Sequence, residues 1–187
     1  MRTAGKLTSV TRYFFEHCPC PVIGVTGTKG KGTTATLISL ILKEAGRDVF
    51  LGGNIGEPPV NFLDRLNRDS FVVLELSSFQ LMDLDRSPHV AVVLNVVNEH
   101  MNYHHSFEEY ISAKQNVARF QNEKDFLILN KDYLYSSDFF SDPDIFCAQK
   151  IFVSGGEDMV NDFAKQICPI SEIGLLGKHN LENVFAA

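Results

Sequence analysis

The sequence predicts a single α/β domain, built on a doubly wound, mostly parallel sheet that is flanked by helices. Two observations predict this fold class. Short apolar runs alternate with longer amphipathic stretches, an order typical of strands and helices joined by right-handed crossovers. Two of the runs, residues 71–76 and 90–97, are apolar almost throughout and rich in β-branched residues, as expected of parallel strands covered on both faces. A length of 187 residues agrees with one domain.

Local signals define the other elements in chain order. Residues 22–27 are expected to form a strand and residues 33–46 a helix, which Gly46 ends because glycine readily takes the conformation of a helix terminus. Residues 48–53 are the next expected strand. Prolines at the start of 58–67 favour the first turn of another helix, because proline lacks the N–H that a first turn leaves free.

The alternation continues after the two apolar runs. Ser106 and Glu109 have the spacing of a capping box, so a helix is expected over residues 106–120. The stretches 125–130 and 150–155 are two further expected strands. Residues 177–187 are expected to begin a terminal helix.

Composition and charge exclude several classes of protein. A net charge of −6 argues against a nucleic-acid surface. The sequence contains neither an apolar run of about 18 residues nor a signal peptide, so we expect a cytoplasmic protein without a membrane partner. Cys18, Cys20, Cys147 and Cys168 are expected to be reduced thiols. Cys18 and Cys20 could chelate a metal, although an incidental pair is the favoured interpretation.

A glycine-rich stretch between the first expected strand and its helix is the strongest local signal. Gly27, Gly30 and Gly32 allow positive φ and a close approach of the backbone to an anion. The exposed N–H groups and the helix N-terminus then attract phosphate. We therefore expect a phosphate-binding loop made of Gly27, Thr28, Lys29, Gly30, Lys31, Gly32, Thr33 and Thr34. The alternative is a glycine-rich turn with a solvated lysine.

This loop departs from the strict pattern G-x-x-x-x-G-K-[ST]. Val25 stands at the first glycine position, and Gly32 stands where a metal-binding hydroxyl is usual. Lys31 is still expected to reach the β- and γ-phosphates. We assign the metal-binding hydroxyl to Thr33, one residue later, with Thr34 as the reserve.

Glu75 is a candidate metal ligand near the end of a long apolar run, and His100 lies near the end of the next run. Glu75 lies near the carboxyl end of its run, where open α/β sheets bind ligands. A buried carboxylate needs a cation or hydrogen-bond donors, and magnesium prefers such hard oxygen ligands. His100 follows the next run and would lie beside Glu75 if the two strands pair. The alternatives are an exposed glutamate at a strand end and an ordinary loop histidine.

Lys114 interrupts an apolar helix face. The spacing i, i+3, i+4, i+7 places it with Phe107, Tyr110, Ile111 and Val117. One interpretation is a lysine whose ammonium reaches water along its stem. The other is a desolvated lysine, since burial favours the neutral amine, which can react with carbon dioxide to form an anionic carbamate.

The loop "VTGTKGKGTT" resembles the ATP loop of the Mur ligase superfamily, which includes folylpolyglutamate synthetases. The segments "GGNIG", "LELSSFQL", "LNVVNEHMNYH", "YISAKQNV" and "GKHNLENVFAA" occur in the order expected of the D-glutamate-adding members. The resemblance covers roughly residues 12–187. It implies the P-loop-like central domain of a Mur ligase, with ATP and two magnesium ions as cofactors.

The resemblance also implies roles for individual residues. Lys31, Lys114 and His100 would be catalytic. The first magnesium would be held by Thr33, and the second by Glu75, His100 and Lys114, with Lys114 carbamylated. Asn180 and Asn183 would contact adenine, although alone they suggest a cap or a solvated face. Asn54, Ser77 and Gln80 would line the substrate cleft. Glu99 and Asn102 replace aspartates that are usual in the family, which changes the charge beside His100.

The implied reaction joins D-glutamate to UDP-N-acetylmuramoyl-L-alanine through an acyl phosphate, as a step of peptidoglycan precursor synthesis. We expect a lead-in over residues 1–20 and an ATP-binding central domain over residues 21–187, in a monomer. The N-terminal UDP-binding and C-terminal amino-acid-binding domains of related ligases are expected to be absent, so the chain would be a fragment with poor turnover. The open alternatives are a folylpolyglutamate synthetase, another Mur ligase and a non-catalytic nucleotide-binding module.

Overall fold

The computed structural model describes residues 8–97, 106–133, 138–154, 174–175 and 177–187. Its centre is a six-stranded sheet in the order β2-β3-β1-β4-β5-β6, and every strand pair is parallel. The strands are β1 (Val22–Thr26), β2 (Val49–Gly53), β3 (Phe71–Glu75), β4 (Val90–Val93), β5 (Phe126–Asn130) and β6 (Gln149–Val153). The predicted α/β fold class is confirmed.

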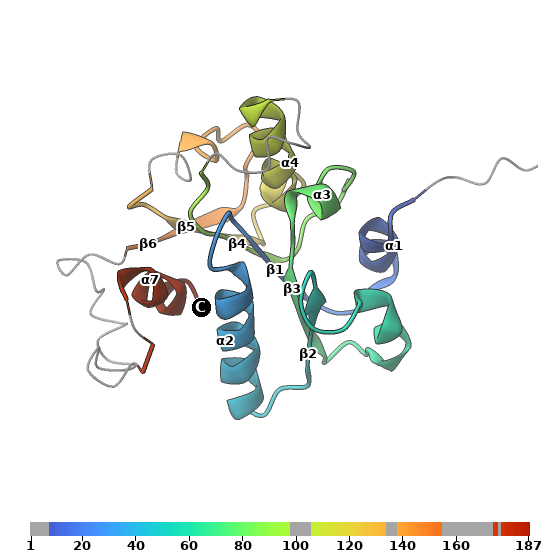
Figure 1. Ribbon diagram of the computed structural model, residues 1–187. Coiled ribbons are helices and arrows are strands. Elements are labelled where there is room, and N and C mark those ends of the chain that lie inside the picture. Colours follow the sequence, from blue (N-terminus) through green and yellow to red (C-terminus); the bar gives the residue numbers. More distant parts are fainter. Residues whose placement is uncertain (1–7, 98–105, 134–137, 155–173, 176) are drawn as a thin grey trace, which may run out of the picture.

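Helices cover both faces of this sheet (Figure 1). The helix α2 (Lys31–Glu44) and the terminal helix α7 (Lys178–Ala186) lie on one face, and α4 (Phe107–Arg119) lies on the other with α1 (Val10–His17) and the short α3 (Ser78–Leu81). Each face has its own apolar core. The larger core gathers the buried aromatic side chains of α1 and α4, and the smaller one lies under α2.

The chain reverses its direction of travel across the sheet at β1. It passes from β1 through α2 to the edge strand β2, returns to β3 beside β1, and continues to β4 on the other side of β1. Open α/β sheets bind ligands at such a switch point, outside the carboxyl ends of the strands. The glycine-rich loop follows β1 directly, so it lies at this position.

The helix termini agree with their sequence signals. The helix α2 ends near Gly46, whose φ is 73°. The hydroxyl of Ser106 accepts a hydrogen bond from the Glu109 N–H at 3.2 Å and caps α4. Of the helices in the part of the chain that the structure describes, none is long and apolar enough to cross a membrane.

The prediction of a helix over residues 58–67 was wrong. Two 3₁₀ turns, η1 (Pro59–Asn61) and η2 (Leu63–Arg65), occupy this segment, and Phe62 between them has a φ of −113°. The Phe62 ring is 1% exposed and packs 5.8 Å from the Phe14 ring centroid and 5.4 Å from that of Phe50. Burial of this ring in the core therefore takes precedence over a continuous helix.

The expected lead-in contains an element that the sequence interpretation left out. Ser9 caps α1 by accepting a hydrogen bond from the Arg12 N–H at 3.1 Å. Phe14 of this helix is fully buried, and Phe15 is 9% exposed. The helix is thus part of the larger core, while the domain boundary at residue 20 stays a prediction.

Candidate active site

The loop between β1 and α2 leaves its backbone open to a ligand. Gly27 and Gly30 have φ angles of 148° and 86°, which side-chain-bearing residues rarely adopt. Gly30 is the N-cap of α2 and, having no side chain, makes no capping hydrogen bond. The free N–H groups of the first turn and the helix dipole together favour an anion at this point.

Lys31 lies along this loop. Its Nζ donates a hydrogen bond to the Thr28 carbonyl oxygen at 2.9 Å, and the side chain is half-buried. The flexible stem keeps the ammonium at the loop without fixing it in a buried ion pair. Lys31 is therefore positioned to exchange this internal acceptor for a phosphate oxygen.

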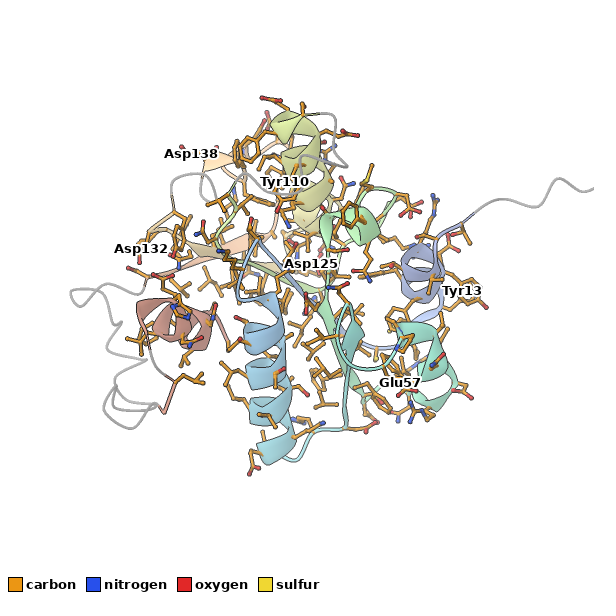
Figure 2. The ribbon with its side chains drawn as sticks, in the orientation of Figure 1. Tyr13, Glu57, Tyr110, Asp125, Asp132 and Asp138 are labelled. Atoms are coloured by element: carbon orange, nitrogen blue, oxygen red, sulfur yellow. The ribbon has the colours of Figure 1, made fainter. Side chains whose placement is uncertain are left out.

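Thr28 fastens the loop to its neighbours. Its hydroxyl accepts a hydrogen bond from the Val97 N–H at 2.9 Å and lies 3.1 Å from both the Val97 carbonyl oxygen and the Tyr110 hydroxyl on α4 (Figure 2). Its backbone N–H donates to the Asn95 carbonyl oxygen at 2.7 Å. Both polar groups of Thr28 thus hold the loop against the β4–α4 connection, so phosphate contact by this residue remains a prediction.

Glu75 reaches the first turn of α2 from the end of β3. The residue is 5% exposed, and its Oε1 accepts a hydrogen bond from Asn54 Nδ2 at 3.3 Å. Its Oε2 lies 3.3 Å from the position that a Cβ on Gly32 would take. Among the described residues no lysine, arginine or histidine pairs with this carboxylate. A nearly buried carboxylate beside a phosphate-type loop fits a hard cation such as magnesium.

The two candidate hydroxyls differ in accessibility. Thr33 is half-buried, whereas Thr34 is fully buried and its Oγ1 has no hydrogen-bond partner within the described ranges. Thr33 is the better placed of the two for a ligand that arrives from solvent. No cluster of three or more His, Cys, Asp or Glu side chains occurs among the described residues, so a cation here would need oxygen donors from phosphate or water as well.

Lys114 points into the protein. It is 2% exposed, and its Nζ donates to the Gly27 carbonyl oxygen at 2.8 Å and to Thr26 Oγ1 at 3.4 Å. The ammonium also lies 4.7 Å from the centroid of the Tyr110 ring. The interpretation in which this lysine extends to water is therefore wrong. Its amine lies directly beneath the phosphate-type loop.

The terminal helix α7 closes the other side of the loop. Asn183 is 6% exposed, and its Oδ1 occupies the space that a Cβ on Gly30 would need, so a side chain there would displace Asn183. Asn183 Nδ2 donates to Asn180 Oδ1 at 3.3 Å. A cavity of about 130 Å³ opens between loop and helix, and its lining is Lys29, Gly30, Leu94, Asn95, Asn130, Tyr133, His179, Glu182 and Asn183.

Sequence reasoning missed several residues of this cavity. Tyr133 donates a hydrogen bond to Glu182, and burial together with this carboxylate raises the pKa of Tyr133 to about 12. Asn130 ends β5, and its Oδ1 accepts from the Asp132 N–H at 2.9 Å. The position of Asn130 at the carboxyl end of a strand was a usable signal. The approach of Glu182 to Tyr133 had none, because 49 residues separate them.

Two predicted substrate residues have a local role. The hydroxyl of Ser77 accepts from the Gln80 N–H at 3.3 Å, while Gln80 Oε1 accepts from the Ser77 N–H at 2.9 Å, so the pair forms a capping box on α3. Their contact with substrate stays a prediction. His100 lies outside the described residues, as do Glu99 and Asn102.

The fold and this site define an α/β protein with a P-loop-like strand–loop–helix at its topological switch point. A family model described as the Mur ligase middle domain matches residues 25–187. The chain belongs to the Mur ligase family.

Two similar curated relatives share one name. The UDP-N-acetylmuramoylalanine–D-glutamate ligase of Clostridium kluyveri is 40% identical over 188 residues, which are 97% of this chain and 41% of the relative. The ligase of the same name from Acetivibrio thermocellus is 40% identical over 193 residues, with the same coverage of 97% and 41%. This chain spans about two fifths of the length of these relatives.

Solved structures agree with the fold. The MurF ligase from Thermotoga maritima in complex with ADP has a TM-score of 0.58 at 25% identity, over 77% of this chain and 35% of that one. FolC of E. coli in complex with DHPP and ADP has a TM-score of 0.52 over 75% of this chain and 45% of that one. At 17% identity, this second likeness shows the fold alone.

Proposed function

We propose that this chain is the ATP-binding core of a ligase that adds D-glutamate to UDP-N-acetylmuramoyl-L-alanine in peptidoglycan precursor synthesis. The observation that carries the proposal is the 40% identity, along 97% of this chain, to ligases with that name. The geometry supports it independently, because a phosphate-type loop, a buried carboxylate and a buried lysine meet at one edge of the sheet. In this proposal the enzyme is a cytoplasmic monomer.

The chain's own residues would hold and orient ATP. The loop N–H groups and Lys31 would bind the β- and γ-phosphates, while the cavity beside Asn183 would take the adenine ring. Carboxamides suit a purine edge because they both donate and accept hydrogen bonds. The ADP complex of the Thermotoga maritima relative supports nucleotide binding by this fold. Phosphoryl transfer needs mainly such positioning and the neutralisation of charge.

Magnesium fits the residues present. Thr33 would hold a first ion. Glu75, whose Oε2 faces the first turn of α2, would hold a second together with His100 and a carbamylated Lys114. When bound, magnesium neutralises the charge of the phosphates and polarises them. Carbamylation would convert the buried cation of Lys114 into an anion, which requires that its present hydrogen bond to the Gly27 carbonyl be exchanged.

The proposed reaction proceeds in two steps. The terminal carboxylate of UDP-N-acetylmuramoyl-L-alanine attacks the γ-phosphorus of ATP and releases ADP, which gives an acyl phosphate. The amine of D-glutamate then attacks the carbonyl carbon, and phosphate leaves as the amide forms. Asn54, whose Nδ2 donates to Glu75 Oε1 at 3.3 Å, would lie on the substrate side of the site with Ser77 and Gln80.

The test uses the full-length gene product with ATP, magnesium and labelled D-glutamate. Label should enter UDP-N-acetylmuramoyl-L-alanine, with one ADP and one phosphate released per amide. Lys31→Ala should lower this rate by about 10²–10³ or more, because one charge contact to the reacting phosphates is lost. Labelling of a folate acceptor would favour a folylpolyglutamate synthetase instead. If the protein binds nucleotide but shows no turnover, it is a non-catalytic nucleotide-binding module.

A further inference from the structure

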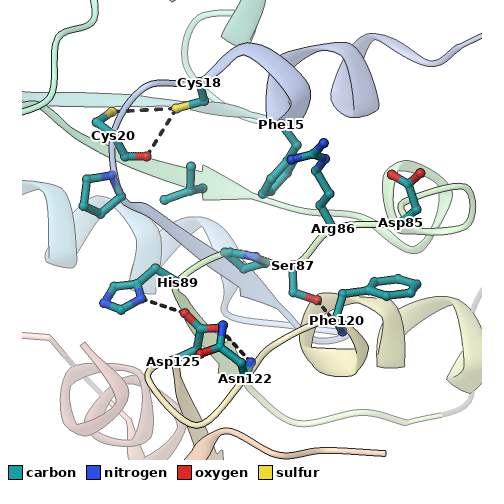
Figure 3. Close-up of a pocket in the computed structure, with 13 residues that line it drawn as sticks. Phe15, Cys18, Cys20, Asp85, Arg86, Ser87, His89, Phe120, Asn122 and Asp125 are labelled. Carbon is teal, nitrogen blue, oxygen red and sulfur yellow. Dashed lines mark hydrogen bonds and ion pairs between the residues drawn. The ribbon is translucent and has the colours of Figure 1, made fainter.

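A second cavity lies at the opposite edge of the sheet from the phosphate-type loop. It measures about 360 Å³ and is bordered by the amino ends of β1, β4 and β5, at Val22, His89 and Asp125 (Figure 3). His89 Nδ1 and Asp125 Oδ1, which both line the cavity, lie 2.8 Å apart. Because all strands are parallel, this cavity and the proposed active site lie at opposite edges of the sheet.

Two thiols meet at the wall of this cavity. Cys18 is the C-cap of α1, and Cys20 precedes the residue that leads into β1. Their Sγ atoms lie 3.7 Å apart, and Cys18 Sγ also lies 3.5 Å from the Cys20 carbonyl oxygen, to which it donates. Both side chains are half-buried free thiols. The backbone is therefore already folded so that the two sulfurs face each other across Pro19.

The geometry suits a disulfide better than a metal. A disulfide needs the sulfurs at about 2.05 Å, so the two Sγ atoms must close from their present 3.7 Å. A structural zinc site needs four ligands, and the described residues contain no third His, Cys, Asp or Glu that completes a metal-binding group here. Two thiols alone leave such a site incomplete.

We propose that Cys18 and Cys20 are a reversible redox pair, which a small anionic disulfide entering this cavity oxidises to an intramolecular disulfide. Disulfides in reducing compartments are usually transient, catalytic or redox-sensing. A partly exposed disulfide between two cysteines separated by a single residue would be easily reduced. The link would reversibly lock the junction between α1 and β1.

The proposed exchange conserves the number of thiols. The Cys18 thiolate attacks one sulfur of the incoming disulfide and releases one small thiol, leaving a mixed disulfide on Cys18. Cys20 then loses its proton and attacks Cys18 Sγ, which releases the second small thiol. Two protein thiols are oxidised and one small disulfide is reduced. Burial, and then the neighbouring Cys18, raise the pKa of Cys20, so we assign the first attack to Cys18.

Arg86 gives the cavity its preference for an anionic disulfide. Asp85 forms an ion pair with Arg12, and Asp125 contacts His89, which is charged only when its imidazole is protonated. The guanidinium of Arg86 lines the same cavity and makes no ion pair with any described residue. It is thus the cationic group that can attract the carboxylates of a ligand such as oxidised glutathione.

The test treats the reduced chain with oxidised glutathione, followed by alkylation of the remaining thiols and peptide mass mapping. The peptide with Cys18 and Cys20 should be lighter by the mass of two hydrogens and should resist alkylation. Reduced glutathione should restore both the original mass and the alkylation. Cys20→Ser should stop at a mixed disulfide on Cys18. Cys147→Ser, at an exposed thiol that does not line this cavity, should leave the reaction unchanged.

A second arm tests the ligand class. Arg86→Gln should slow oxidation by oxidised glutathione about two- to fivefold, the range for one exposed charge pair, and leave oxidation by the uncharged hydroxyethyl disulfide unchanged. If Arg86→Gln and the wild type are oxidised by oxidised glutathione at the same rate, the anionic preference is overturned. Stable mixed disulfides on both cysteines, or a metal ion that co-purifies with the pair and blocks oxidation, would overturn the redox pair.

Discussion

Lys114 shows how one residue on an apolar face connects packing with chemistry. Its amine lies 2.8 Å from the Gly27 carbonyl oxygen, beneath the loop that we assign to ATP phosphates. The hydroxyl of Thr26 and the face of the Tyr110 ring contact the same amine and help to replace lost water. A desolvated amine held beside a proposed metal site is well placed for carbamate formation, because the carbamate would neutralise charge there.

Carbamylation can be observed directly. In ¹³C-labelled bicarbonate with magnesium and ADP, the protein should give a carbamate carbon signal that Lys114→Met removes. Lys43→Met, at an exposed lysine on the last turn of α2, should retain the signal. In the full-length enzyme, Lys114→Met should lower kcat by about 10²–10³. A spectrum that is unchanged by Lys114→Met would contradict the assignment.

The phenol of Tyr133 predicts a pH dependence of stability. Burial and Glu182 raise its pKa from the usual 10.0 to about 12 in the folded protein, so folding favours the protonated phenol. This contribution is fully present below pH 10.0 and is lost as the pH rises toward about 12. The free energy of unfolding of the wild type should therefore fall relative to that of Tyr133→Phe across this window. Chemical denaturation at several pH values measures the difference, and a constant difference would contradict the contact with Glu182.

The strand–loop–helix from β1 to α2 is the element on which the site depends. The sequence was sufficient to predict this strand, loop and helix because glycine spacing, a preceding apolar run and a following helical pattern are all local signals. Apolar patterning also predicted the six described strands, since parallel strands covered on both faces have a distinctive composition.

Local signals failed where tertiary packing decides the structure. Residues 58–67 carry helix-favouring prolines, yet burial of the Phe62 ring divides the segment into two 3₁₀ turns. The cavity beside α7 depends on contacts between residues far apart in the chain, such as Tyr133 with Glu182. Spacing could not predict such contacts.

A substitution at Gly30 tests the role of the loop between β1 and α2. Its φ is 86°, and Asn183 Oδ1 fills the space that a Cβ would take, so a side chain there would strain the backbone and displace Asn183. Gly30→Ala should therefore weaken ADP binding at least about tenfold and destabilise the fold by about 1–3 kcal/mol. Gly46→Ala is the matched control, because φ is 73° there and nothing lies within 4 Å of the added carbon.

Calorimetric titration with ADP and denaturant unfolding distinguish the two variants. Gly46→Ala should lose stability through its backbone alone and keep its affinity for ADP. If Gly30→Ala and Gly46→Ala bind ADP equally well, the contact between the loop and α7 has no part in the site.

At the scale of the whole molecule, the strand order assembles the site. The sheet places β3 and β4 on either side of β1, so Glu75 and the β4–α4 connection both reach the loop after β1. The helix α7 comes from the far end of the chain and packs against α2. The nucleotide would therefore contact parts of the chain that only the complete fold brings together.

The central claim is that triphosphate binds where β1 passes into α2. Its most direct measurement is the change in unfolding free energy of this chain on addition of ATP and magnesium. At a free concentration 100 times the Kd, binding should stabilise the fold by about 2.7 kcal/mol. Lys43→Ala should retain this stabilisation, and Lys31→Ala should lose most of it. Equal stabilisation of Lys31→Ala and the wild type, or none in the wild type, would contradict the account.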